Sequence, residues 1–162
     1  MQDFLEKLLE ELVKAGTDFY IPATGASIGI FENICQLKLP ADLKEFYQCC
    51  NGFGPDVKDQ FQVLPLTEAT MELIQCGKGK RGSRFVLAEY MLYCDWWEVE
   101  LTPTTETSYH IVNAGHRSGI PLVLTHSIEE FLARYLAGGV FGKGGLYEWH
   151  EEIEQRGLHL IA

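Results

Sequence analysis

The sequence lacks the cysteine and histidine patterns of metal-binding and disulfide-stabilised proteins. Its five cysteines are odd in number and include no C-x-x-C pair, which argues against a disulfide framework and against a zinc ribbon. Its five histidines include neither H-E-x-x-H nor two residues at i, i+4 spacing, so no helix presents two imidazoles to one metal ion. We therefore expect reduced, mostly buried thiols, no metal site and no cofactor.

Long apolar runs are also missing. No stretch approaches the roughly 20 apolar residues that a membrane-spanning helix needs. The first residues, MQDFLEKLLEEL, carry acids where a signal peptide would carry a basic region. These features lead us to expect a cytoplasmic protein that does not associate with membranes.

Basic residues are scarce relative to acidic ones. Thirteen Lys and Arg stand against 23 Asp and Glu, which gives a formal net charge of −10. A field of this sign repels nucleic acid and attracts cationic surfaces. The composition therefore predicts a basic protein partner and no nucleic-acid ligand.

The length of the chain and the periodicity of its apolar residues predict a single domain over residues 1–162, in which three or four strands in series form an antiparallel meander. Pro22, Gly25 and Gly29 interrupt residues 17–34, where we expect a loop that contains a brief strand. The other helices and strands are expected in short, well-separated segments. The expected helices cover residues 3–16, 40–50, 67–77, 127–139 and 148–156, and the expected strands cover residues 61–66, 84–92, 93–101, 109–114 and 120–125.

Three of the expected helices carry detailed terminal or facial signals. The first has an apolar stripe that ends with Leu12 and Val13. The helix at 67–77 is expected to be capped by Thr67. In the helix at 127–139, Ser127 and Glu130 have the spacing of a capping box, and the apolar residues that follow form a buried stripe.

The adjacent thiols Cys49 and Cys50 raise the question of a reactive or chelating site. Cys50 continues the apolar spacing of the helix at 40–50, and Asn51-Gly52 is typical of a left-handed helix end. Successive side chains on a helix diverge by about 100°, so two adjacent cysteines are poorly placed to coordinate one ion. We interpret the pair as the end of a helix.

The segment GKGKRGSR contains G-x-G-x-x-G and nearly spells a phosphate-binding loop. Such loops follow a strand and open a helix, so that helix amides meet the phosphate. Here a helix is expected before the segment and a strand after it. We interpret it as a solvated hairpin or connector, and the alternative that Lys78, Lys80, Arg81 and Arg84 contact an anion stays open.

One surface combination suits protein recognition, because aromatic residues supply contact area and acids select a basic partner. We expect Trp97 to lie in the core and leave Trp96 open between core and surface. The candidate protein-binding residues are Asp56, Asp59, Asp95, Trp96, Glu98 and Glu100.

The order of LPADLKEFYQCCNG, FQVLPL, FVLAEYMLYCDWWEVEL and THSIEEFLARYL resembles the SUKH superfamily over roughly residues 25–140. That superfamily includes the yeast regulator of cell-wall assembly and killer-toxin resistance. The tail after residue 140 lies beyond the resemblance. The motif positions matched are Leu39, Pro40, Asn51, Gly52, Ser127 and Phe131.

The resemblance implies a single α+β domain, with a mainly antiparallel or mixed sheet flanked by helices, and without catalytic residues. Many bacterial members of this superfamily are immunity proteins that neutralise polymorphic or contact-dependent toxins, often nucleases. The expected function is therefore non-enzymatic binding of a basic toxin domain, and an acidic chain suits a basic cleft.

Two alternatives stay open at the level of sequence. One is an intracellular regulatory scaffold of the cell-wall-regulator type. The other is a small cysteine-dependent enzyme in which His116 activates Cys49, which requires the two side chains to come within hydrogen-bond reach.

Overall fold

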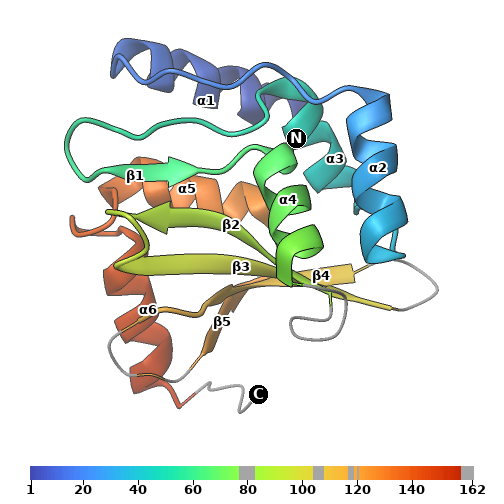
Figure 1. The fold of residues 1–162 in the computed structure, drawn as a ribbon. Helices are drawn as coiled ribbons and strands as arrows, with labels where there is room; N and C mark the ends of the chain where they lie inside the picture. The colour runs from blue at the N-terminus through green and yellow to red at the C-terminus, as the bar shows by residue number, and fades with distance from the viewer. Residues whose placement is uncertain (77–82, 104–107, 117–118, 120, 158–162) are drawn as a thin grey trace.

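A computed structural model describes residues 1–76, 83–103, 108–116, 119 and 121–157 of the chain. Within these residues, five strands form one sheet in the order β1-β2-β3-β4-β5, with every neighbouring pair antiparallel. The expected α+β class is confirmed, and the sheet is a meander in which sequence neighbours pair (Figure 1). The strands are β1 (Phe61–Val63), β2 (Arg84–Tyr90), β3 (Asp95–Thr102), β4 (Ser108–Asn113) and β5 (Leu122–Thr125).

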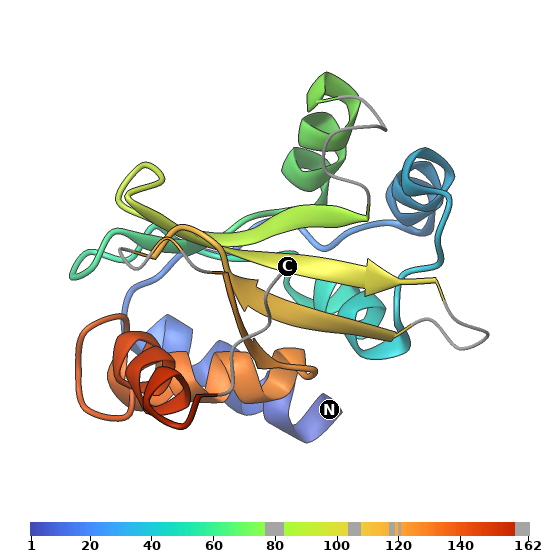
Figure 2. The same cartoon turned by 90° about the horizontal axis from the view of Figure 1, so that it is seen from below.

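Helices cover both faces of the sheet. Seen from below, the sheet separates α4 from α1, α5 and α6 (Figure 2). α2 packs against α4, and α4 in turn packs against β2. The helices are α1 (Gln2–Lys14), α2 (Gly25–Cys35), α3 (Ala41–Cys49), α4 (Leu66–Cys76), α5 (Ile128–Gly138) and α6 (Leu146–Gln155).

The two N-terminal helices depart from the sequence-based expectation. Val13 does not belong to the buried stripe of α1, because Leu12 already faces the core and the next side chain points about 100° away; Val13 is 62% exposed. The loop expected at 17–34 is also wrong over its second half, which forms α2. Thr24 caps this helix by accepting a hydrogen bond from the amide of Ser27 at 3.1 Å, and burial of Phe31 outweighs the unfavourable glycines.

The helix that ends at Cys49-Cys50 is confirmed as a structural feature. Pro40 is the residue immediately before α3, and Cys50 is buried at its end. Asn51 has a positive φ of 51°, and Gly52 follows at 92°. A Cβ on Gly52 would lie 2.3 Å from the carbonyl oxygen of Val63, so this position requires glycine.

Asn51 also links three segments. Its Nδ2 donates to the carbonyl of Ile21 at 2.8 Å, and its Oδ1 accepts from the amide of Leu66 at 2.9 Å. α4 therefore begins at Leu66 with its first amide held by Asn51, and the cap expected at Thr67 is wrong. The connector GKGKRGSR lies outside the described residues up to position 82.

The start of α5 confirms the predicted cap but modifies the capping box. The hydroxyl of Ser127 accepts a hydrogen bond from the amide of Glu130 at 3.2 Å. The Glu130 carboxylate does not return to Ser127; it accepts from the Thr125 hydroxyl, which itself accepts from the Ser127 amide at 3.1 Å. Thr125, at the end of β5, therefore stands between the Ser127 amide and the Glu130 carboxylate, which would contact each other directly in an ordinary capping box.

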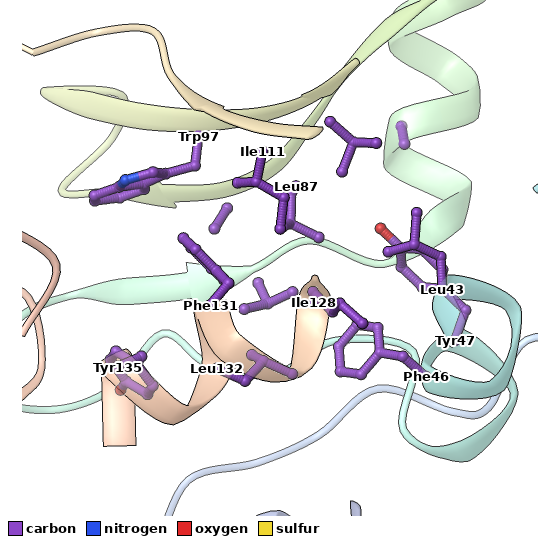
Figure 3. Close-up of a cluster of buried hydrophobic side chains, with 14 of the residues drawn as sticks. Leu43, Phe46, Tyr47, Leu87, Trp97, Ile111, Ile128, Phe131, Leu132 and Tyr135 are labelled. Carbon is purple, nitrogen blue, oxygen red and sulfur yellow. The ribbon is translucent and has the colours of Figure 1, made fainter. Parts of the chain in front are cut away.

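The core lies between the sheet and α5 (Figure 3). Trp97 is fully buried, as predicted, with its ring centroid 6.1 Å from that of Phe131 and 5.6 Å from that of Phe61. Phe61 stacks on Tyr135 at 4.3 Å. The motif residue Phe131 is therefore a core residue, and Leu39 is buried as well. This core fixes one end of the sheet, where three loops meet.

Candidate protein-binding surface

Three loops from distant parts of the sequence gather at the end of the sheet where β2 turns into β3. They are residues 54–60, residues 91–94 and residues 139–145, all at the left in Figures 1 and 2. The amide of Met91 donates to the carbonyl of Gln60 at 3.1 Å. The ring of Phe141 packs edge-on against Tyr90, with ring centroids 5.1 Å apart. The three loops therefore form one continuous surface.

Large apolar side chains are unusually exposed on this surface. Leu92 is 90% exposed and Val57 is 88% exposed. Scattered exposed apolar residues are ordinary, but several on adjoining loops mark an interaction site. We call this set the loop-end surface: Val57, Met91, Leu92, Tyr93 and Phe141.

The hairpin that carries three of these residues has an uncommon backbone. Met91, Leu92 and Tyr93 have consecutive positive φ angles of 49°, 55° and 63°. Side chains other than glycine, asparagine and aspartate rarely adopt this conformation, and such strain clusters at functional sites. The amide of Tyr93 is held by the Glu89 carboxylate at 2.7 Å, which supports the turn. The hairpin therefore holds apolar side chains out where turn-forming residues would be expected.

An acidic cleft of about 330 Å³ opens beside the loop-end surface. Its walls come from the end of α1, the loop that carries Asp56 and Asp59, and the end of α5. Val57 lines the cleft as well, which makes the cleft continuous with the apolar surface. The remaining lining residues include Glu11, Tyr135 and Leu136, together with Lys58.

The two aspartates of the cleft are held by neutral donors. The Tyr135 hydroxyl donates to Asp56 Oδ2, and the amide of Asp59 donates to Asp56 Oδ1 at 2.6 Å. The amide of Val140 donates to Asp59 Oδ2 at 3.3 Å. Burial, with a further contribution from Asp56, raises the pKa of Tyr135 above its ordinary range. These hydrogen bonds fix the carboxylates in place and leave their negative charges uncancelled.

The predicted acidic stretch on β3 is arranged differently. Trp96, Glu98 and Glu100 share one face of the sheet, as their alternation predicts. Trp96 is partly buried, and its Nε1 donates to Glu98 Oε1 at 3.0 Å. Glu100 lies 2.7 Å from Arg84 Nη2 and 3.1 Å from His110 Nε2. The charge of Glu100 is therefore matched within the chain.

Asp95 does not lie on that face. It is 1% exposed and points to the opposite side of the sheet, where Asn113 Nδ2 and the amide of Trp96 donate to its Oδ1 at 2.8 and 2.7 Å. The expected contact role of Asp95 is thus corrected, because strand alternation separates neighbouring residues onto opposite faces. Asp56 and Asp59 lie at the loop end, and the other candidates lie on β3, where Glu98 is buried like Asp95, so the predicted residues do not form one surface.

The cysteine pair has surroundings unlike those of a nucleophile. Burial comes first among the causes that raise the pKa of the Cys49 thiol, and Glu45 and Glu6 add to it. Burial raises the pKa of Cys50 to about 12. Among the described residues, His116 contacts Asp95, Tyr147 and His150. A thiol held neutral by burial and by nearby carboxylates is a poor nucleophile at neutral pH.

Sequence reasoning missed the apolar half of the loop-end surface. A usable signal was present, because MLYC fills a hairpin position where Asn, Asp or Gly would be ordinary. Val57 and Phe141 carried no comparable signal, since an isolated apolar residue in a loop does not reveal what lies beside it. Their proximity depends on the tertiary fold.

Two further properties of the described residues concern membrane-spanning helices and metal-ligating side chains. None of the helices seen in residues 1–157 has both the length and the apolar character that crossing a membrane requires. No group of three or more potential metal-ligating side chains forms among the described positions.

No protein-family model matches the chain, and no curated protein sequence gives a significant match. The resemblance to the SUKH superfamily therefore stays a prediction based on motif order.

Proposed function

We propose that this protein is a non-enzymatic binding module of the immunity type, which acts in the cytoplasm and neutralises a toxin by covering a basic face of the toxin domain. The observation that carries the proposal is the loop-end surface with its adjoining acidic cleft. Exposed apolar side chains supply area to bury, and fixed carboxylates select a cationic partner. The resemblance to SUKH immunity proteins, many of which bind nucleases, gives the partner class.

Charge supports the same proposal. The formal net charge of −10 accelerates encounter with a basic partner through long-range attraction. Asp56 and Asp59 are held rigidly by Tyr135 and backbone amides, so little side-chain entropy is lost when a Lys or Arg side chain enters the cleft. The apolar residues then determine how slowly the complex dissociates.

The direct test is binding to the toxin candidate encoded beside this protein in its genome. We expect a stable complex and protection of cells that express the toxin domain. We also expect the association rate to fall as ionic strength rises, because screening at about 0.15 M already shortens the reach of charge to about 8 Å. Absence of both a complex and protection would refute the proposal.

Matched variants locate the contact surface. Leu92→Ser removes an exposed apolar anchor, and the double variant Asp56→Asn with Asp59→Asn removes two charges at similar shape. We expect each to weaken binding by at least about tenfold, which corresponds to about 1.4 kcal/mol. Ile74→Ser is the control, because Ile74 is a 53% exposed apolar residue on α4, outside the loop-end surface. Equal effects of Leu92→Ser and Ile74→Ser would place the contact elsewhere.

The regulatory-scaffold alternative gives a different result in the same assay. It predicts capture of several host proteins without protection against any toxin domain. No contact among the described residues favours a regulatory scaffold over the immunity function. We therefore propose the scaffold function only if several host proteins are captured and no protection is seen.

A further inference from the structure

The hairpin between β2 and β3 is a braced projection at the end of the sheet (Figure 2). The amide of Cys94 donates to the carbonyl of Tyr90 at 3.0 Å and closes the turn. The carboxylate of Glu89, a residue that is 2% exposed, accepts from the Tyr93 amide through Oε2 and from Gln62 Nε2 through Oε1. These contacts hold the hairpin tip, residues 91–93, in one shape before any partner arrives.

Leu92 is the most exposed residue of the hairpin tip. It is 90% exposed, against 52% for Met91 and 50% for Tyr93. Its φ of 55° is one that Asn or Gly adopts more readily than Leu, so local backbone preference does not explain a leucine there. A flat partner could bury only one side of this side chain, whereas a concave partner would surround it and remove most of its apolar area from water. The hairpin tip therefore fits a concavity.

The charges beside the hairpin tip indicate what kind of concavity it fits. Val57 belongs both to the loop-end surface and to the wall of the acidic cleft, so the two are continuous. Three residues that line the cleft are acidic, and among the described lining residues only Lys58 is basic. Complementary charge therefore favours Lys and Arg side chains around the partner's concavity.

A concavity with a basic rim has a well-defined use in enzymes. Enzymes hold their substrates in concave pockets that combine apolar walls with a few polar groups. Proteins that act on nucleic acid neutralise its phosphates with Lys and Arg. A groove with an apolar floor and a basic rim is therefore typical of an enzyme with a polyanionic substrate. The loop-end surface offers the complement of such a groove, because it joins an apolar tip to fixed carboxylates.

We propose that the loop-end surface occupies the substrate groove of the toxin domain, with Leu92 inserted into the groove and a Lys or Arg of the groove's rim seated in the acidic cleft. The nucleic-acid substrate of the toxin needs the same groove, so the substrate and this protein exclude each other. This inference rests on the proposed function and adds how the toxin is neutralised. A contact at a remote face of the toxin would leave the groove open to substrate.

The test measures whether this protein and nucleic acid compete for the toxin domain that is encoded beside this protein. The probes are fluorescent DNA and RNA oligonucleotides with phosphorothioate linkages, which resist cleavage, and the readout is fluorescence polarisation. We expect each molecule of this protein to displace one bound oligonucleotide. A ternary complex of the two proteins with an oligonucleotide would overturn the inference and leave the proposed function standing. A complex with a toxin domain that binds neither DNA nor RNA would overturn it as well, whereas absence of any protein complex would refute the proposed function and this inference together.

Leu92→Asn separates insertion of the hairpin tip from electrostatic attraction. Asn leaves the net charge unchanged and favours a positive φ, so the variant should fold as stably as the natural protein. We expect half-displacement of the oligonucleotide to need at least about tenfold more Leu92→Asn than natural protein. Ile21→Asn is the control and should displace the oligonucleotide normally, because Ile21 is 86% exposed between α1 and α2, outside the loop-end surface. If Leu92→Asn competes as well as Ile21→Asn does, Leu92 is not inserted and the inference is wrong.

Discussion

The two acidic regions of this protein contain the same residue types but differ in the groups that surround their carboxylates. On β3, Glu100 is matched by Arg84 and His110, and Asp95 is 1% exposed, so that a partner cannot reach it. At the loop end, Asp56 and Asp59 border an open cleft and are held by a tyrosine hydroxyl and backbone amides. A carboxylate held by neutral donors keeps its field, whereas one paired with a cation loses much of it. The local partners, more than the number of acids, decide which region can attract a partner.

The largest expected difference between the two regions concerns stability. Trp97→Ala removes a fully buried ring from β3, and we expect it to lower the free energy of unfolding by about 3–5 kcal/mol. Leu92→Ala truncates a side chain that is 90% exposed at the hairpin, and we expect a change within about 0.5 kcal/mol. Chemical denaturation of both variants provides the measurement. A similar loss of stability for both variants would mean that the Leu92 side chain is packed within the protein and is not exposed to a partner.

The outward face of β3 should also be sensitive to substitution. A Cβ on Gly115 would lie 2.4 Å from Trp96 Cε3, so Gly115→Ala must displace the Trp96 ring. We expect a loss of about 1–3 kcal/mol in the free energy of unfolding. Gly25→Ala is the matched control, because a Cβ there meets nothing within 4 Å, and it should be neutral or slightly stabilising. A tolerated Gly115→Ala would show that Trp96 moves freely.

At the loop end, the hydrogen bond from Tyr135 to Asp56 should affect how the free energy of unfolding changes at alkaline pH. A raised folded-state pKa contributes stability below the unfolded value of about 10, and this stability is lost as pH rises toward the folded value. Tyr135→Phe should lower the free energy of unfolding by about 1–2 kcal/mol at neutral pH, and its stability should fall less steeply above pH 10. Denaturation at pH 8 and pH 11 tests both points. If the stability of Tyr135→Phe falls as steeply above pH 10 as that of the natural protein, Tyr135 does not have the raised pKa on which this prediction is based.

The smallest effect is expected for the ion pair of Arg84 and Glu100. Both side chains are about one quarter exposed, at 26% and 28%, so the coupling should be about 0–1 kcal/mol and should decrease with salt. A double-mutant cycle with Arg84→Gln and Glu100→Gln isolates the pair. A coupling that is both larger and independent of salt would contradict the screening expected for such a pair.

Particular residues show where sequence reasoning succeeds. Trp97 and Cys50 were placed in the core from alternation and helical spacing, and Asn51-Gly52 was recognised as a helix end, because these signals are local. The helix α2 was missed because its glycines weaken the local signal, while Phe31 gains its burial from contact with Phe85 on a distant strand. Asp56 and Asp59 lie beside the cleft, but Asp95 was expected at the surface and is buried, because alternation along β3 places it on the same face as Trp97.

The sequence by itself determined the α+β class, the antiparallel order of strands, the buried stripes of α3 and α5 and the excess of negative charge, since each depends on periodicity or composition within a short window. Only the tertiary structure decided which carboxylates keep an outward field, that three loops combine apolar side chains at one end of the sheet, and that His116 meets His150. These arrangements join residues up to about 80 positions apart, such as Asp56 with Tyr135. No local pattern encodes such contacts, because they form only when the sheet and its helices bring distant segments together.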